Sequence, residues 1–195
     1  KAAKKHKLLG LPGFKEQAEK KILEGISSLA IENRIPLKQA VKISNNIASK
    51  LRKLKEVVKA EIAGSIRRKK SRIRDIDLVV LTEKPEIVAE KFTKMDFVDK
   101  ILGKGKEKAT IITKQGMQAD VRFFNLEEYG AGLLYFTGDK QHNIWLRKIA
   151  IKKGWKLNEY GLFQGKKRIA GKTEKEIYEK LGVKMLSPDK RIGEV

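Results

Sequence analysis

Two aspartates, two residues apart, open an apolar run in the middle of the chain. In the stretch DIDLVVL, residues 75–81, Asp75 and Asp77 alternate with Ile76 and Leu78. Because side chains i and i+2 of an extended strand share a face, the two carboxylates should lie side by side, with Ile76 and Leu78 turned toward the core. Close carboxylates repel each other unless a cation lies between them, and Mg²⁺ prefers oxygen ligands. The spacing therefore predicts a metal site on one face of a strand.

A third carboxylate lies in a later run with the same alternation, QADVRFF, residues 118–124. If its small and apolar residues face the core, Asp120 shares the outer face with Gln118 and Arg122. Three carboxylates can hold two Mg²⁺ ions about 3.5 to 4 Å apart, one activating an attacking oxygen and the other holding a polyphosphate. The three aspartates are therefore candidate ligands for phosphoryl or nucleotidyl transfer.

The segment before the first aspartate suits a phosphate group. Gly64 and Ser65 form a small-residue turn that leads into a short basic helix, and Arg68 follows in the sequence GSIRR. The N-terminus of a helix exposes backbone N–H groups to phosphate oxygens, a serine hydroxyl adds a donor, and an arginine adds a forked cation. We interpret residues 64–81 as a phosphate cradle followed by metal ligands.

Composition narrows the class of protein. The 195 residues are 41% hydrophobic, enough for one substantial core or two small subdomains, and carry a net charge of +21, which makes a polyanion such as nucleic acid the natural partner. There is no cysteine, which excludes disulfides, thiolate nucleophiles and cysteine-based zinc sites, and two histidines are too few for a histidine-rich metal site. No apolar run is long enough to span a bilayer and no signal-peptide pattern opens the sequence, so we expect a cytoplasmic, nucleoid-associated protein.

The elements that must position these residues follow from hydrophobic periodicity and turn signals. A helical N-terminal part is expected to precede a small mixed sheet covered by helices, and a second group of helices with short apolar strands is expected after residue 127. The C-terminal segment 187–195 is expected to fray. The predicted strands are 57–63, 76–82, 97–102, 108–114 and 117–124. Within residues 8–25 a helix is predicted after a turn at Pro12-Gly13, and the other predicted helices are 35–54, 85–92, 127–136, 142–153 and 174–181.

Together these motifs resemble those of the family X DNA polymerases, the DNA polymerase beta superfamily, over nearly the whole chain. GSIRR with DIDLVVL resembles the family's Gly-Ser and Asp-x-Asp signature, ADVRFF its third-aspartate strand, and LLYFTGDKQHNIWLR its Tyr-Phe-Thr-Gly motif. LNEYGLF is similar to a further family segment, and LPGFKEQAEKKILEGI to its helix-hairpin-helix. The chain looks like a minimal polymerase core similar to bacterial and archaeal polymerase X.

The resemblance implies an α+β fold built on a nucleotidyltransferase palm with a mixed β-sheet. Helical fingers with a helix-hairpin-helix-like DNA-binding segment would occupy residues 1–53. The palm would occupy residues 54–126, and an α+β, thumb-like subdomain that selects the nucleotide would occupy residues 127–195. No complete lyase domain is recognisable, so we expect no deoxyribose-phosphate lyase activity.

The resemblance also assigns roles to particular residues. It makes the aspartates catalytic metal ligands, with Asp120 assisting deprotonation of the primer 3′-hydroxyl. The implied nucleotide contacts are Gly64, Ser65, Arg68, Tyr135, Phe136, Thr137, Gly138 and Asn143, the implied DNA contacts are Gly13, Lys15 and Arg147, and the implied modulating residues are Arg122, Glu159 and Tyr160. The sequence departs from the family pattern at Lys15, Arg74 and Gln118.

The function implied is template-directed addition of deoxynucleotides to a DNA 3′-end, with short-gap filling in DNA repair as the expected task. Two Mg²⁺ ions, for which Mn²⁺ could substitute, are the implied cofactors, and gapped or primer-template DNA and deoxynucleoside triphosphates are the implied partners of a monomer. Two alternatives stay open: a related nucleotidyltransferase that needs no template or acts on RNA ends or small molecules, and a DNA-binding module whose aspartates no longer catalyse.

Overall fold

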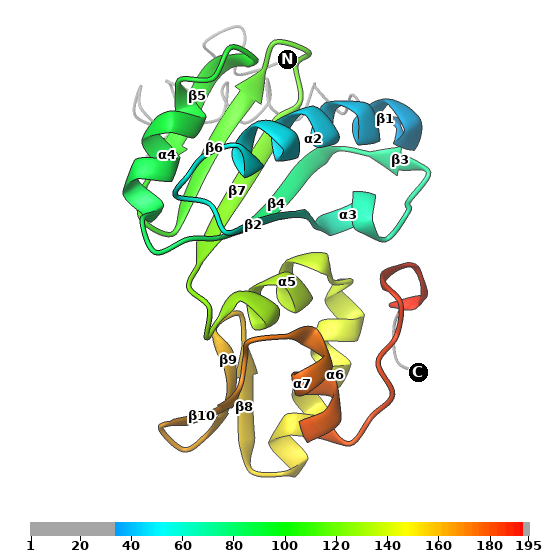
Figure 1. The fold of residues 1–195 in the computed structure, drawn as a ribbon. Helices are drawn as coiled ribbons and strands as arrows, with labels where there is room; N and C mark the ends of the chain where they lie inside the picture. Colours follow the sequence, from blue (N-terminus) through cyan, green and yellow to red (C-terminus); the bar gives the residue numbers. More distant parts are fainter. Residues whose placement is uncertain (1–33, 193–195) are drawn as a thin grey trace, which may run out of the picture. The chain divides into compact units, whose positions relative to one another are not determined.

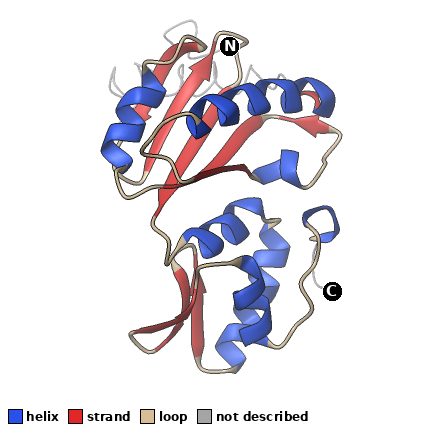
Figure 2. Cartoon of the chain, in the orientation of Figure 1, coloured by secondary structure: helices blue, strands red, loops and turns tan. Residues whose placement is uncertain are grey.

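A computed structural model describes residues 34–192 of the chain. The chain divides into two compact units, residues 1–34 and 35–195, and the fold below is that of the second. Sheets of five, three and two strands, together with helices, make up the described part of this unit, which confirms the predicted α+β class (Figures 1 and 2). The predicted turn and helix within residues 8–25, with Gly13 and Lys15, lie outside the described residues.

The larger sheet has five strands in the order β2-β4-β7-β6-β5. Strands β4 and β7 are parallel, and the other neighbouring pairs are antiparallel, so the sheet is mixed as predicted. The parallel pair exists because a helical crossover, α4 (Pro85–Thr93), carries the chain away from β4 before it returns to the sheet. The strands are β2 (Lys59–Ile62), β4 (Asp75–Leu81), β5 (Val98–Lys104), β6 (Lys108–Thr113) and β7 (Gln118–Phe124).

One face of this sheet holds the main core. Helices α2 (Leu37–Arg52) and α4 (Pro85–Thr93) supply Ile47 and Phe92, which are fully buried in the same cluster as Leu78. In Figure 1 both helices lie across the same face of the sheet. The alternation of the central strands thus turns every second residue toward this core and leaves the aspartates on the opposite face.

The opposite face changes character along the strands. At its far end Val79, Leu81 and Phe124 pack against Tyr129 and Leu133 of another helix, α5. The face is therefore covered by α5 where the strands end, while the aspartates lie at the start of the same strands. Helix α5 is Tyr129–Thr137.

The C-terminal part has its own core around a three-stranded antiparallel sheet. Leu146, Leu162 and Ile177 are fully buried there. The elements are α6 (Lys140–Lys152), β8 (Trp155–Asn158), β9 (Gly161–Gln164), β10 (Lys167–Ala170) and α7 (Glu174–Leu181). Strand β10 was not predicted, because its sequence KRIA shows cationic side chains rather than an apolar alternation.

Short elements complete the fold: the helix α3 (Gly64–Arg67), the paired strands β1 (Ile35–Pro36) and β3 (Arg72–Ile73), and the 3-10 helix η2 (Pro188–Lys190). The prediction that the C-terminus frays from residue 187 is wrong for the described residues, because Arg191 has no exposed surface. Its side chain binds Glu174 of α7 and the backbone of the segment before η2.

Candidate active site

The three predicted metal ligands share one face of the two parallel strands. Asp77 of β4 lies directly opposite Asp120 of β7, and Asp75 lies opposite Gln118. Between the two aspartates of β4, Ile76 is fully buried in the core. The in-register pairing of β4 with β7 thus brings together carboxylates that are far apart in the sequence, as the two alternating runs predict.

Burial and repulsion within this group both affect the ionisation of Asp77. Burial raises the pKa of its carboxyl to about 7, and the negative charges of Asp75 and Asp120 act in the same direction. Arg122 and Arg68 lower the pKa, but not enough to offset burial and like charge. A site of this kind would gain from a cation, and its oxygen donors suit a hard divalent ion such as Mg²⁺.

Each outer carboxylate is held by protein donors. The Arg74 guanidinium donates to Asp75 Oδ2 through Nε at 3.1 Å and Nη2 at 2.9 Å. Asp120 accepts from the Thr110 hydroxyl at 2.5 Å on Oδ1 and from Gln118 Nε2 at 2.7 Å on Oδ2. As these side chains stand, no three acidic, histidine or cysteine groups within residues 34–192 are close enough together to hold a metal ion.

The absence of a side chain at Gly64 lets the Asp77 carboxylate lie against the Gly64-Ser65 turn. A Cβ atom on Gly64 would lie 2.0 Å from Asp77 Oδ2, and the residue has a φ of +57°, so a side chain is excluded by both space and backbone. The backbone N–H of Ala63 also donates to the Asp77 carbonyl at 2.8 Å. Helix α3 therefore begins against the central carboxylate, and Ala63, the residue that precedes it, offers no side-chain cap to the helix N–H groups.

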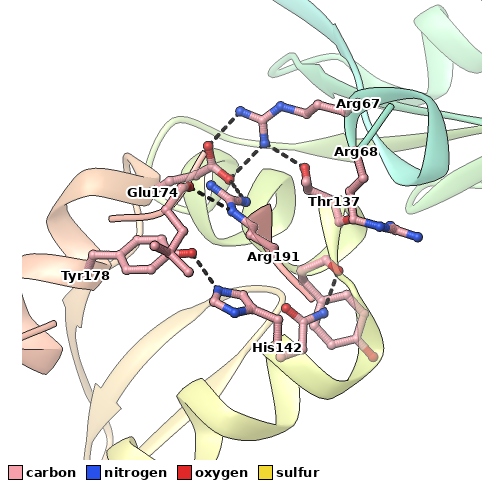
Figure 3. A network of polar contacts seen from close by, with 10 residues as sticks. Arg67, Arg68, Thr137, His142, Glu174, Tyr178 and Arg191 are labelled. Carbon is pink, nitrogen blue, oxygen red and sulfur yellow. Dashed lines mark hydrogen bonds and ion pairs between the residues drawn. The ribbon is translucent and has the colours of Figure 1, made fainter. Parts of the chain in front are cut away.

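Both arginines of this turn reach the Tyr-Phe-Thr-Gly motif at the end of α5 (Figure 3). Arg67 Nη1 donates to the Thr137 hydroxyl at 2.6 Å, and Arg68 Nη1 donates to the Thr137 carbonyl. Gly138 follows with a φ of +69°, and a Cβ there would lie 3.1 Å from Arg68 Nη1. The two predicted nucleotide-binding segments are thus in direct contact.

A buried ion-pair network lies behind this contact, and no sequence pattern indicates it. Arg67 donates two hydrogen bonds to Glu174 of α7, at 2.8 Å to Oε1 and 2.7 Å to Oε2. Arg191 donates to the same Oε1 at 2.6 Å, and its Nε donates to the Leu186 carbonyl at 3.1 Å. Burial raises the pKa of Glu174, but the hydrogen bonds and charges of the two arginines outweigh it and the net pKa is lowered. Figure 3 shows Glu174 between the two guanidinium groups.

His142 adds a structural contact to this region. It is fully buried, and its Nε2 lies 2.7 Å from the Tyr178 hydroxyl. Its backbone N–H donates at 2.9 Å to Asp139, whose side chain caps α6. The histidine therefore joins α6 to α7, as Figure 3 shows.

The predicted base contacts lie on α6. Asn143 Nδ2 donates to the Tyr135 carbonyl at 2.7 Å, and Arg147 Nε donates to the Asn143 carbonyl at 3.3 Å. Tyr135, Asn143 and Arg147 line a small cavity together with Ala131, Leu134, Leu157 and Asn158. Asn143 is thus held by the backbone of the motif that is expected to form the sugar wall.

Of the three residues predicted to be modulating, Arg122 and Glu159 both act electrostatically on Tyr160. The Arg122 guanidinium lies over the Phe136 ring, 4.6 Å from its centroid. Burial raises the pKa of Tyr160, with Glu107 and Glu159 raising it further and Arg122 lowering it. Arg122 also lowers the pKa of Asp77, so one cation acts electrostatically on both the aspartates and Tyr160.

Comparisons with known proteins agree with this geometry. A family model described as DNA polymerase beta palm matches residues 34–152, and one described as DNA polymerase beta thumb matches residues 132–192. The Bacillus subtilis DNA polymerase/3′-5′ exonuclease PolX is 28% identical over 97% of this chain, which spans only 34% of that relative's length. The Repair DNA polymerase X of African swine fever virus is 30% identical over 81% of this chain and 99% of its own length.

Solved structures share the fold. A Leishmania infantum polymerase beta in a ternary P/T complex has a TM-score of 0.76 with this chain, at 20% identity, covering 98% of this chain and 87% of that one. The same polymerase in a ternary gap complex also has a TM-score of 0.76, at 20% identity, covering 97% of this chain and 79% of that one. Coverage this wide takes in both the large and the small sheet described above.

Proposed function

Since this chain belongs to the family X DNA polymerases, the DNA polymerase beta family, we propose that it adds deoxynucleotides to the 3′-end of a DNA primer under the direction of a template. The observation that carries the proposal is the row of carboxylates formed by Asp75, Asp77 and Asp120 beside the Gly64-Ser65 turn. A deoxynucleoside triphosphate bound at this turn would place its reacting phosphorus beside the three carboxylates.

The family implies a divalent metal, and carboxylate oxygens are donors that suit Mg²⁺, with Mn²⁺ as a substitute, although the three side chains must move closer together to hold an ion. Asp75, Asp77 and Asp120 would hold two such ions, since their carboxylates share one face and repel one another without a cation. Bound ions would activate the attacking 3′-oxygen and stabilise the charge on the departing pyrophosphate. Asp120 would accept the proton that the primer hydroxyl loses.

The remaining groups bind and orient. Ser65 and Arg68 would contact the triphosphate, and the segment Tyr135–Gly138 would lie beneath the sugar and base. Asn143 would contact the incoming base and Arg147 the template side. Because little covalent chemistry falls to the protein in phosphoryl transfer, this positioning is its main contribution.

Arg122 is proposed to restrain the aspartates when the enzyme is open, and Glu159 and Tyr160 are proposed to belong to the hinge that closes it. The surroundings of its guanidinium support this, because its charge acts on both Asp77 and Tyr160. We also propose that the palm occupies residues 54–126, between a helical region 1–53 and a thumb-like subdomain 127–195.

The proposed DNA is a gapped or primer-template duplex, and the proposed task is short-gap filling in repair by a monomer. The relatives named as repair polymerases and the related structures solved with primer-template and gapped DNA support it, as does the charge of +21. Gly13 and Lys15 are proposed to contact the DNA backbone. No helix among the described residues is long and apolar enough to cross a membrane. A DNA substrate would place the protein with the nucleoid.

Single-nucleotide incorporation on a gapped duplex tests the function. Each deoxynucleotide is offered opposite one template base, with Mg²⁺ and with EDTA. Addition of only the complementary nucleotide, and only with metal, is expected. Addition of all four would favour a template-independent transferase, and no addition with either Mg²⁺ or Mn²⁺ would favour a DNA-binding module.

A further inference from the structure

Asp120 differs from the other two aspartates in that each of its carboxylate oxygens accepts a hydrogen bond from a residue of β6 or β7. Thr110 Oγ1 donates to Oδ1 at 2.5 Å, and Gln118 Nε2 donates to Oδ2 at 2.7 Å. Two donors on opposite oxygens fix the plane of a carboxylate. A carboxylate has about four acceptor sites, so each oxygen keeps a lone pair for another partner.

Strand register puts the two donors where they are. Thr110 of β6 pairs with Asp120 of β7, which in turn pairs with Asp77 of β4, so these three side chains form one row across three strands. Gln118 precedes Asp120 by two residues on the same face. The aspartate is therefore flanked by its fellow carboxylate on one side and by a hydroxyl on the other.

The burial of Thr110 is otherwise unexplained. Its exposed fraction is 7%, although it lies on the face opposite to its neighbours Ala109 and Ile111, which are fully buried in the main core. A buried hydroxyl costs free energy unless it has a partner, and valine would suit the strand equally well. The acceptor described for this hydroxyl is Asp120.

We propose that Thr110 and Gln118 are positioning residues that hold the Asp120 carboxylate in place for metal binding, while Asp75 and Asp77 move toward it to complete the site. The inference rests on the proposed function, since it presumes that Asp120 is a metal ligand and proton acceptor. Residues that orient a metal ligand typically change metal affinity or activity by about 10- to 100-fold when removed.

Thr110→Val tests the hydroxyl, because it keeps the shape and the β-branched side chain. We expect Mn²⁺ affinity, followed by electron paramagnetic resonance of free Mn²⁺, to fall about 10-fold. The kcat for single-nucleotide incorporation should fall by a similar factor, with KM for the nucleotide nearly unchanged. The melting temperature should stay the same or rise, which separates positioning from a structural role. Thr110→Ser keeps the hydroxyl and should restore both affinity and kcat.

Two controls make the test specific. Thr113→Val removes another buried hydroxyl from the same strand, one that accepts from the Met117 backbone N–H, and should leave Mn²⁺ affinity unchanged. In an Asp120→Ala background, Thr110→Val should have no further effect on Mn²⁺ affinity. Gln118→Met should weaken Mn²⁺ binding less than Thr110→Val, because water can replace a donor at this half-buried position.

Unchanged Mn²⁺ affinity in Thr110→Val, or an equal loss in the Asp120→Ala background, would overturn the inference. Mn²⁺ binding needs no catalysis, so it decides this question separately from the proposed function. A wild-type chain that binds Mn²⁺ through Asp120 but extends no primer would contradict the polymerase proposal alone.

Discussion

Asp77 and Asp120 lie opposite each other, in register, on the parallel strands β4 and β7. The pairing sets the carboxylates of two distant segments side by side, with Asp75 on the same face. Burial and the charges of Asp75 and Asp120 raise the pKa of Asp77 as a direct result. The stability of the folded protein should therefore depend, through these three carboxylates, on both pH and bound metal.

Replacing Asp120 by alanine should stop catalysis and spare DNA binding. Removing a residue that supports a metal ligand typically lowers activity by roughly 10- to 100-fold. Because Asp120 is proposed as a direct ligand and proton acceptor, its removal should lower kcat by more than that. Incorporation on a gapped duplex and fluorescence anisotropy of labelled DNA measure the two effects. If DNA binding were lost together with turnover, the assignment of Asp120 as a ligand would fail.

The stability of the metal-free protein should fall as pH rises toward 8. The pKa of Asp77 is raised from 3.8 to about 7 in the folded state, so its contribution to stability is complete below the unfolded pKa of 3.8 and is lost as pH rises through 7. Asp77→Asn should therefore raise the melting temperature at pH 8 by a few degrees, the shift that about 1 kcal/mol produces in a chain of this size.

Added Mg²⁺ should raise the wild-type melting temperature more at pH 8 than at pH 5, because only the ionised carboxylate binds it. The exposed Asp99 provides a matched control, since Asp99→Asn should leave the pH dependence unchanged. A melting temperature of the metal-free wild type that does not fall between pH 5 and pH 8 would contradict the prediction.

Gly64→Ala should disturb Asp77 as well as the backbone. The new Cβ would lie 2.0 Å from Asp77 Oδ2, so the carboxylate must move and Mn²⁺ affinity should fall about 10-fold or more. Gly116→Ala is the matched control, because Gly116 also has a positive φ of +77° but has nothing within 4 Å of the new atom. Both variants should lose about 1 kcal/mol from backbone strain. Equal Mn²⁺ affinities in the two would refute the close contact.

Glu174→Gln should destabilise the protein strongly, by about 3 kcal/mol, since it leaves the buried guanidinium of Arg191 and that of Arg67 without a countercharge. Urea unfolding measures the loss. Glu179→Gln removes an exposed carboxylate from the same helix and should cost less than about 0.5 kcal/mol. A similar small loss in both variants would show that the network contributes little.

The network also predicts sensitivity to acid. The pKa of Glu174 is lowered below 4.5, so its stabilising contribution is present above pH 4.5 and is lost as pH falls through its folded value. Unfolding free energies measured from pH 6 to pH 3 should fall more steeply in the wild type than in Glu174→Gln. Parallel curves would contradict the assignment.

The sequence alone determined the face that carries the aspartates and the class of fold. Alternation in DIDLVVL and QADVRFF assigns each aspartate to a face, because a strand has only two, and the apolar residues must turn inward. The Gly-Ser turn and the helices 85–92 and 174–181 follow from equally local signals, whereas the Tyr-Phe-Thr-Gly motif is identified by its resemblance to a family. Local patterns suffice here because each property depends on residues a few positions apart.

Only the tertiary structure decided which distant groups meet. Arg67 and Glu174 are 107 positions apart, and nothing near either one indicates its partner. Arg191 lies in a terminal segment that composition marks as frayed, yet the countercharge on Glu174 keeps it buried. Thr110 looks like an ordinary strand residue until β6 is placed in register with β7. Ion pairs and strand neighbours depend on the path of the whole chain, and that path is set by the packing of the cores rather than by any short stretch of sequence.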